Sequence, residues 1–88
     1  MQFEWNPIKA RQNLKKHGVS FDEAVTVFYD PLSATFDDPY HSIDAQRCIA
    51  VGLSSKGLLV VAHVERGENT QIISARPATA HERKNHGK

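Results

Sequence analysis

The chain has 88 residues and a formal net charge of +1, and its 40% hydrophobic share is enough for one small core, so we expect a single domain over residues 1–88. Its one cysteine, Cys48, excludes an internal disulfide and a cysteine-based zinc site. No apolar run approaches the roughly 20 residues of a membrane span, and the first residues lack the pattern of a signal peptide, so we expect a cytoplasmic protein with no membrane contact.

The chain begins with the pattern of a short strand followed by a helix. Residues 3–5 alternate as a strand does. Asn6 is a good N-cap and precedes a proline, which favours a helix from Pro7 to His17. Three polar residues of this helix, Lys9, Asn13 and Lys16, fall at i, i+4 and i+7 and predict a polar stripe along one face.

A corner between two helices is the clearest local signal in the chain. Gly18 can adopt the left-handed conformation that ends a helix, and the basic residues before it suit the negative end of the helix dipole. Ser20 with Glu23 has the spacing of a capping box and predicts a second helix over residues 21–29.

The rest of the chain predicts four strands and a final short helix. The turns between the last three strands are short, which requires antiparallel neighbours. The order β-α-α-β-β-β-β-α predicts an α+β domain, with the helices packed on one face of an antiparallel sheet. The expected strands are residues 32–36, 47–54, 58–65 and 70–76, and Thr79 with Glu82 has the capping-box spacing of a last helix.

Charge is distributed unevenly along the chain. Residues 1–18 carry four cationic side chains against one acidic, and residues 76–88 also carry four against one. Residues 19–46 contain six acidic side chains and no lysine or arginine. If the two basic ends meet in the fold, they form a surface able to bind phosphate, whereas the alternative is scattered, solvated charge.

A glutamate, a histidine and two arginines are candidates for chemistry near one end of the sheet. Period two places His63 and Glu65 on one face of the strand 58–65. Arg66 follows in the turn, and Arg76 ends the next strand. Arginine matches phosphate oxygens with its rigid fork, and glutamate or histidine could move a proton.

Structural interpretations of the same residues stay open. Glu65 could merely pair with an arginine at the surface, and His63 could pack at the sheet edge. His17 lies in line with Leu14, which is typical of a partly buried corner residue. No histidine or carboxylate cluster has metal-ligand spacing, so we expect neither metal nor cofactor, and Cys48 fits a small core residue better than a nucleophile.

Several short stretches form an ordered set over about residues 3–83. They are Phe3-Glu4-Trp5-Asn6-Pro7, Lys16-His17-Gly18-Val19-Ser20-Phe21, Val27-Phe28 with Asp30-Pro31, Arg47 with Ile49 and Gly52, Glu65-Arg66-Gly67, Ile72-Ile73-Ser74-Ala75-Arg76, and Ala78-Thr79 with Glu82-Arg83. Together they resemble the BrnT toxin family. The resemblance implies a RelE-like fold and a type II toxin that cleaves RNA without a metal and arrests growth. It also implies a BrnA-like antitoxin partner, whose complex with the toxin represses its own promoter and contacts DNA through the antitoxin.

The resemblance leads to a hypothesis about the site. We expect Arg76 and Arg66 to hold the scissile phosphate and stabilise its developing charge. Lys16 would add a third cation or help to activate the 2′-OH. Either Glu65 or His17 would serve as the acid or base.

Three further cations, Arg83, Arg47 and Lys9, are expected to contact the RNA, and the acidic segment 37–44 is expected to lie away from it. Two alternatives remain open. The basic surface could hold RNA or a protein without cleaving anything, or the chain could serve only to bind an antitoxin.

Overall fold

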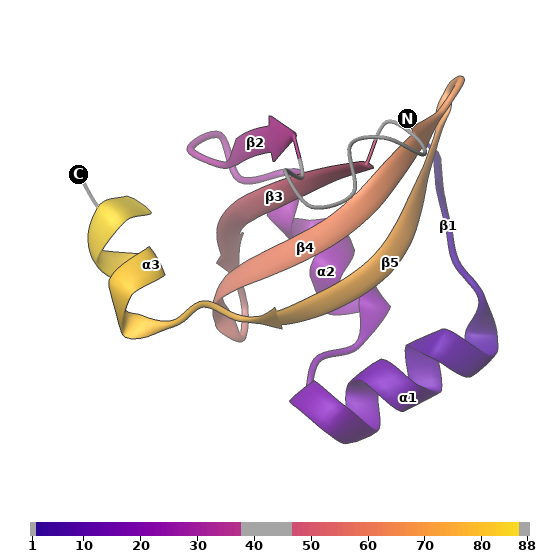
Figure 1. Ribbon diagram of the computed structural model, residues 1–88, viewed down its shortest axis with the longest axis horizontal. Helices are drawn as coiled ribbons and strands as arrows, with labels where there is room; N and C mark the ends of the chain where they lie inside the picture. Colours follow the sequence, from indigo (N-terminus) through magenta and orange to yellow (C-terminus); the bar gives the residue numbers. More distant parts are fainter. Residues whose placement is uncertain (1, 38–46, 87–88) are drawn as a thin grey trace.

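The computed structural model describes residues 2–37 and 47–86 and shows a mixed α+β fold (Figure 1). In this part of the chain, five strands form one sheet and three helices accompany it. The predicted acidic segment 37–44 lies almost entirely outside the described residues. The elements are β1 (Gln2–Glu4), α1 (Pro7–His17), α2 (Phe21–Val27), β2 (Ala34–Asp37), β3 (Arg47–Ser54), β4 (Gly57–Arg66), β5 (Asn69–Pro77) and α3 (Ala80–His86).

The sheet is mixed rather than antiparallel as predicted. Its order is β1-β5-β4-β3-β2, and the neighbours from β2 to β5 are antiparallel. β1, however, pairs with β5 in parallel, with Phe3 opposite Thr70. Two helices, α1 and α2, and three strands lie between β1 and β5 in the sequence. Such a long connection allows the two strands to pair in parallel, which a short turn does not.

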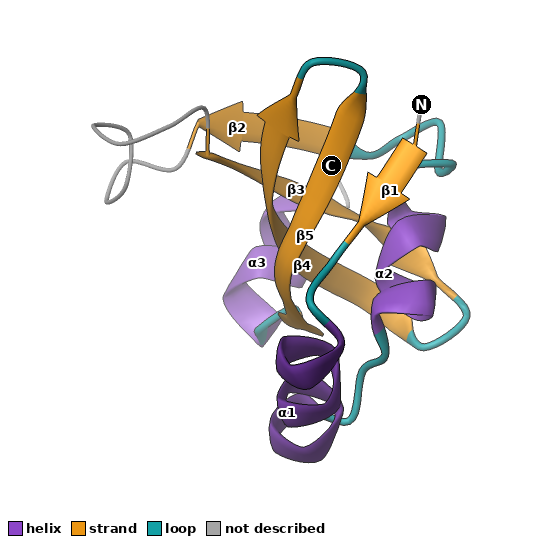
Figure 2. Ribbon diagram, turned by 90° about the vertical axis from the view of Figure 1, so that its right-hand side faces the viewer, coloured by secondary structure: helices purple, strands orange, loops and turns teal. Residues whose placement is uncertain are grey.

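The helices do not share one face of the sheet, which corrects a second expectation. α1 and α2 pack against the strands and bury the core on that side. Figure 2 shows α3 on the side of the sheet opposite α2. A helix as short as α3 carries too few apolar residues to cover a sheet face, and its sequence, AHERKNH, is almost entirely polar.

The core lies between α2 and the inward positions of the central strands. Gly52 allows this close approach, because a Cβ there would lie 2.8 Å from side-chain atoms of both Ser33 and Val27. The residues of the core cluster are Val19, Phe21, Ala24, Val27, Ala50, Leu59, Val61, Ile72 and Ala75.

The predicted helix corner is confirmed. Gly18 adopts φ 72°, and its N–H donates to the carbonyl of Leu14 at 2.8 Å. Ser20 accepts a hydrogen bond from the N–H of Glu23 at 3.1 Å, as an N-cap does. The Glu23 carboxylate accepts instead from the hydroxyl of Ser55, so it ties α2 to the β3–β4 turn.

A bulge in β5 sets which of its side chains face the core. In the pairing with β4, Ile72 is opposite His63 and Ser74 is opposite the neighbouring residue Ala62. Ile73 therefore has no partner on β4. The extra residue shifts the alternation of the strand. Ala75 therefore faces the core, and Ser74 and Arg76 face the other side of the sheet.

Candidate functional site

Helix α1 is attached to the exposed edge of β5 by one buried side chain. β1 pairs with β5 only as far as Gln71, and beyond that point α1 lies beside the strand. Asn13 is 7% exposed there. Its Nδ2 donates to the carbonyl of Ala75 at 2.8 Å and to that of Val19 at 2.9 Å, and its Oδ1 accepts from the N–H of Ala75 at 3.1 Å.

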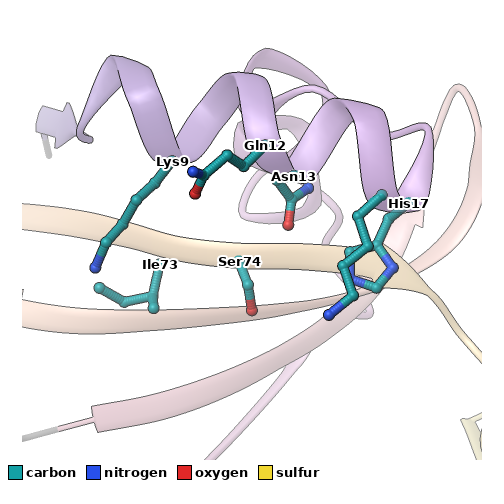
Figure 3. Close-up of a pocket in the computed structure, with 7 residues that line it drawn as sticks. Lys9, Gln12, Asn13, His17, Ile73 and Ser74 are labelled. Atoms are coloured by element: carbon teal, nitrogen blue, oxygen red, sulfur yellow. The ribbon is translucent and has the colours of Figure 1, made fainter.

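This attachment leaves a shallow pocket between α1 and β5. Figure 3 shows Lys9, Gln12 and His17 extending from α1 toward Ile73 and Ser74 of the strand. The pocket has a volume of about 280 Å³. Its lining residues are Lys9, Gln12, Asn13, Lys16, His17, Ile73 and Ser74.

The lining combines cationic and neutral polar groups and contains no carboxylate. Lys9 and Lys16 are both exposed, and His17 is half-buried. Ammonium groups attract phosphate, while the amide of Gln12 and the hydroxyl of Ser74 can donate hydrogen bonds to its oxygens. The pocket is therefore suited to an anionic ligand.

Arg76 lies two residues after Ser74 on the same face of β5, at the strand end near α3. Its guanidinium donates to both carboxylate oxygens of Glu82, at 2.8 and 2.9 Å. The hydrogen bond to Glu82 raises the pKa of Arg76. The same bond, followed by those from Thr79, lowers the pKa of Glu82 to about 2.

The structure does not bring Arg66 close to Arg76, which corrects the expected arginine pair. Arg76 is opposite Val60, and Arg66 is at the far end of the same strand. Six residues of β4 separate the two positions, or about 20 Å at the rise of a strand. The two arginines therefore do not converge on one phosphate in this structure.

Glu65 lies at the Arg66 end of the sheet and faces the opposite side from Arg76. Its Oε2 is 3.1 Å from Nδ1 of the buried His63 and 3.5 Å from the hydroxyl of Thr70. Burial lowers the pKa of His63, and the Glu65 carboxylate opposes that shift. Glu65, whose side chain is 41% exposed, thus pairs with the buried His63 and lies away from Lys16 and His17.

The remaining predicted cations are spread over the molecule. Arg47 begins β3 opposite Val64, at the same end of the sheet as Arg66. Arg83 is exposed on α3, near the Arg76 end, and Lys9 lines the pocket. Cys48 is partly buried, and desolvation, with Asp37 and Glu65 nearby, raises the pKa of its thiol, which disfavours the nucleophilic thiolate.

Gln12, Asn13 and Ser74 are pocket residues that were not among the predicted site residues. The polar stripe of Lys9, Asn13 and Lys16 was the available signal, because three polar residues at that spacing share one face of α1. Ser74 had no comparable signal, since its position depends on the bulge at Ile73.

Two other kinds of feature are absent from the described residues. No group of three or more His, Cys, Asp or Glu side chains there is arranged to hold a metal ion. No helix in residues 2–37 or 47–86 is long and apolar enough to cross a membrane.

The sequence matches one family model over residues 5–82, described as ribonuclease toxin, BrnT, of type II toxin-antitoxin system. No curated protein matches the chain. A type II toxin acts with an antitoxin, so the family implies both a ribonuclease activity and a protein partner. The matched region also includes α1 and the whole of β5, which line the pocket. Because the match covers residues 5–82 of the 88, the chain belongs to the BrnT family of ribonuclease toxins.

Proposed function

We propose that the chain is an endoribonuclease that cleaves RNA without a metal, by attack of a ribose 2′-OH on the adjacent phosphate. The observation that supports this most directly is the pocket between α1 and β5, where Lys9, Lys16 and His17 gather without a carboxylate. Arg76 follows on the same strand. The site thus offers several donors to a phosphate and one imidazole that can accept and release a proton.

The roles follow from these positions. Lys16 and Arg76 hold the non-bridging oxygens of the scissile phosphate, where negative charge grows in the transition state. His17 takes the proton of the 2′-OH as the new P–O2′ bond forms, the P–O5′ bond breaks, and water protonates the departing 5′-oxygen. The products are a 2′,3′-cyclic phosphate and a 5′-hydroxyl end.

Glu82 positions Arg76 in this proposal. Its carboxylate is itself fixed by the N–H of Thr79 at 2.8 Å, and Glu82 returns its own N–H to the Thr79 hydroxyl at 3.2 Å. The guanidinium has five N–H donors, so it can bind Glu82 and still offer hydrogens to a phosphate.

Arg66 and Glu65 have no catalytic role in this proposal, because both lie at the end of the sheet away from Arg76. We propose that Arg66 and Arg47, at the other end of the sheet, contact the RNA backbone, as do Arg83 and Lys9. Contacts of this kind add salt-dependent affinity without taking part in the reaction.

Purified protein incubated with RNA in EDTA tests the activity. We expect cleavage to continue in the chelator and to leave 2′,3′-cyclic phosphate ends. Cleavage that stops in EDTA and returns with added Mg²⁺ would contradict the metal-independent mechanism. Salt-sensitive retention of intact RNA would instead favour the non-catalytic binding module.

The partner and the setting are also proposals. We infer that a BrnA-like antitoxin neutralises the toxin in the cytoplasm, and that the complex represses its promoter through DNA contacts made by the antitoxin. We also propose that the arrangement of α1, α2 and the sheet is RelE-like. The family's type II description supports the partner. Coexpression with the candidate antitoxin should restore growth and retain the toxin on the tagged partner.

A further inference from the structure

The strands β3 and β4 are apolar on both of their faces. Inward positions such as Ala50, Leu59 and Val61 belong to the core. Outward positions of an antiparallel sheet that faces water usually carry polar residues. Here the outward positions on β3 after Arg47 are Ile49, Val51 and Leu53, and those on β4 before Arg66 are Leu58, Val60, Ala62 and Val64.

The edge strand β2 extends this apolar surface. Its outward residues are Ala34, opposite Val51, and Phe36, opposite Ile49. Phe36 is 57% exposed, which is a large fraction for a phenylalanine on a sheet face. We call the surface formed by the outward residues of β2, β3 and β4 the outer face.

Helix α3 borders one end of the outer face, and every apolar residue of that face except Val60 stays at least partly exposed. Figures 1 and 2 show it beyond the end of β5, on the side opposite α2. Its attachment is polar, through the ion pair between Arg76 and Glu82. Within the outer face Val60 is buried, at 6% exposure, Phe36 and Leu53 are 57% and 60% exposed, and the remaining apolar residues are partly exposed. A partly exposed apolar sheet face of this kind is typical of a protein-binding surface.

The charges near α3 indicate the chemistry of the occupant. Arg76, Arg83 and Lys84 are the cationic side chains there, with Glu82 as the acidic group among them. Both Arg83 and Lys84 are exposed. An apolar segment with acidic flanks complements such a surface, because its carboxylates meet cations while its apolar residues cover the sheet.

We propose that the antitoxin covers the outer face with an apolar segment flanked by acidic residues. This rests on the proposed function in two respects, the antitoxin partner that the family implies and the phosphate-binding role of Arg76. Arg76 is an outward residue of β5, so a segment seated there also covers the cation that holds the scissile phosphate. The antitoxin thereby neutralises the toxin by occupying its RNA surface.

RNA fits the apolar part of this face less well. Bases bind open sheets by stacking on aromatic side chains. Among the outward residues of β2, β3 and β4 in the described part of the chain, Phe36 is aromatic and the other apolar ones are aliphatic. Aliphatic side chains provide no stacking platform but pack well against a protein segment.

The test compares two surface variants in the full chain. Phe36→Glu places a charge on the outer face, where the apolar part of the segment would have to bury it without a partner. Ile8→Glu makes the same kind of change on α1 at a residue with 58% exposure, which matches the 57% of Phe36. The probe is the purified product of the neighbouring reading frame that restores growth when coexpressed with the wild-type toxin.

We expect Phe36→Glu to weaken antitoxin binding at least tenfold by calorimetry, with RNA cleavage by the free toxin retained, and Ile8→Glu to bind as wild type. A photo-crosslinking residue at position 36, but not at position 8, should capture the antitoxin. Circular dichroism establishes that both variants are folded. Cleavage is measured separately, so failure of the ribonuclease proposal is distinguishable from failure of this one.

Four results would overturn the proposal. Unchanged antitoxin affinity of folded Phe36→Glu would remove the outer face from the interface. Loss of RNA binding with antitoxin affinity intact would assign the face to RNA. A wild-type dimer that Phe36→Glu dissociates, with crosslinks only between toxin copies, would assign it to self-association. Absence of any neighbouring product that binds the toxin would contradict the partner itself.

Discussion

The side chain of Asn13 pairs with both backbone groups of Ala75, much as a neighbouring strand would. Its amide nitrogen donates to the Ala75 carbonyl at 2.8 Å, and its amide oxygen accepts from the Ala75 N–H at 3.1 Å. β1 has already left the edge of β5 at this level. One helical side chain therefore completes the hydrogen bonding of the strand and holds α1 beside it, where the basic pocket forms.

Replacing Asn13 with alanine should destabilise the protein by about 2–4 kcal/mol, because it leaves the N–H and carbonyl of Ala75 and the carbonyl of Val19 without this partner. Chemical denaturation measures the change in unfolding free energy. Gln12→Ala, one residue away and exposed, should change stability by less than about 0.5 kcal/mol. Equal stabilities of the two variants would show that the Asn13 bonds contribute little.

Lys16→Ala and Arg76→Ala should each lower the rate of RNA cleavage by about 10²–10³-fold, the loss typical of one transition-state donor. The rate of cyclic phosphate formation under saturating RNA measures this, and growth arrest on expression gives a second readout. Arg66→Ala is the matched control, because it removes the same side chain about 20 Å away along the sheet.

The control should weaken RNA binding and reduce its salt dependence while leaving the saturated cleavage rate near that of wild type. If folded Lys16→Ala and Arg76→Ala cleave as fast as wild type, the site assignment is wrong. If Arg66→Ala is instead the inactive variant, the reaction belongs at the other end of the sheet.

Stability should fall as the pH drops below the ordinary histidine range near 6.5, because of His63. Burial lowers the pKa of this side chain in the folded protein. The unfolded chain then binds a proton that the folded chain does not, so acid favours unfolding, and the stability is fully present above 6.5. Unfolding free energies of wild type and His63→Phe between pH 7 and pH 5 check this, and the variant should have the flatter profile. A parallel decline in both proteins would assign the effect to other groups.

The contact between Arg76 and Glu82 should persist far into the acid range. The pKa of Glu82 is lowered to about 2, first by Arg76 and then by Thr79. Its contribution to stability is therefore present above its ordinary value near 4.5 and is lost as the pH falls through about 2. Carboxyl NMR of Glu82 measures the titration, and in Arg76→Ala the midpoint should move upward. An unchanged midpoint in that variant would rule out the arginine as the main cause.

Local signals in the sequence determined the helix corner and the mixed class of the fold. Gly18 ends α1 and Ser20 begins α2 as predicted, because a cap depends on the conformation and hydrogen bonds of only a few adjacent residues. The second helix ends at Val27 rather than Tyr29, since the N–H groups of Phe28 and Tyr29 bond to carbonyls three residues back.

The tertiary structure decided which chemical groups meet. The separation of Arg66 from Arg76 depends on the pairing of β4 with β5, and the orientation of Ser74 depends on the bulge at Ile73. Neither follows from periodicity, because strand register is set by contacts between distant segments. The polar stripe on α1 was visible in the sequence, but only packing against the free edge of β5 converts it into a pocket.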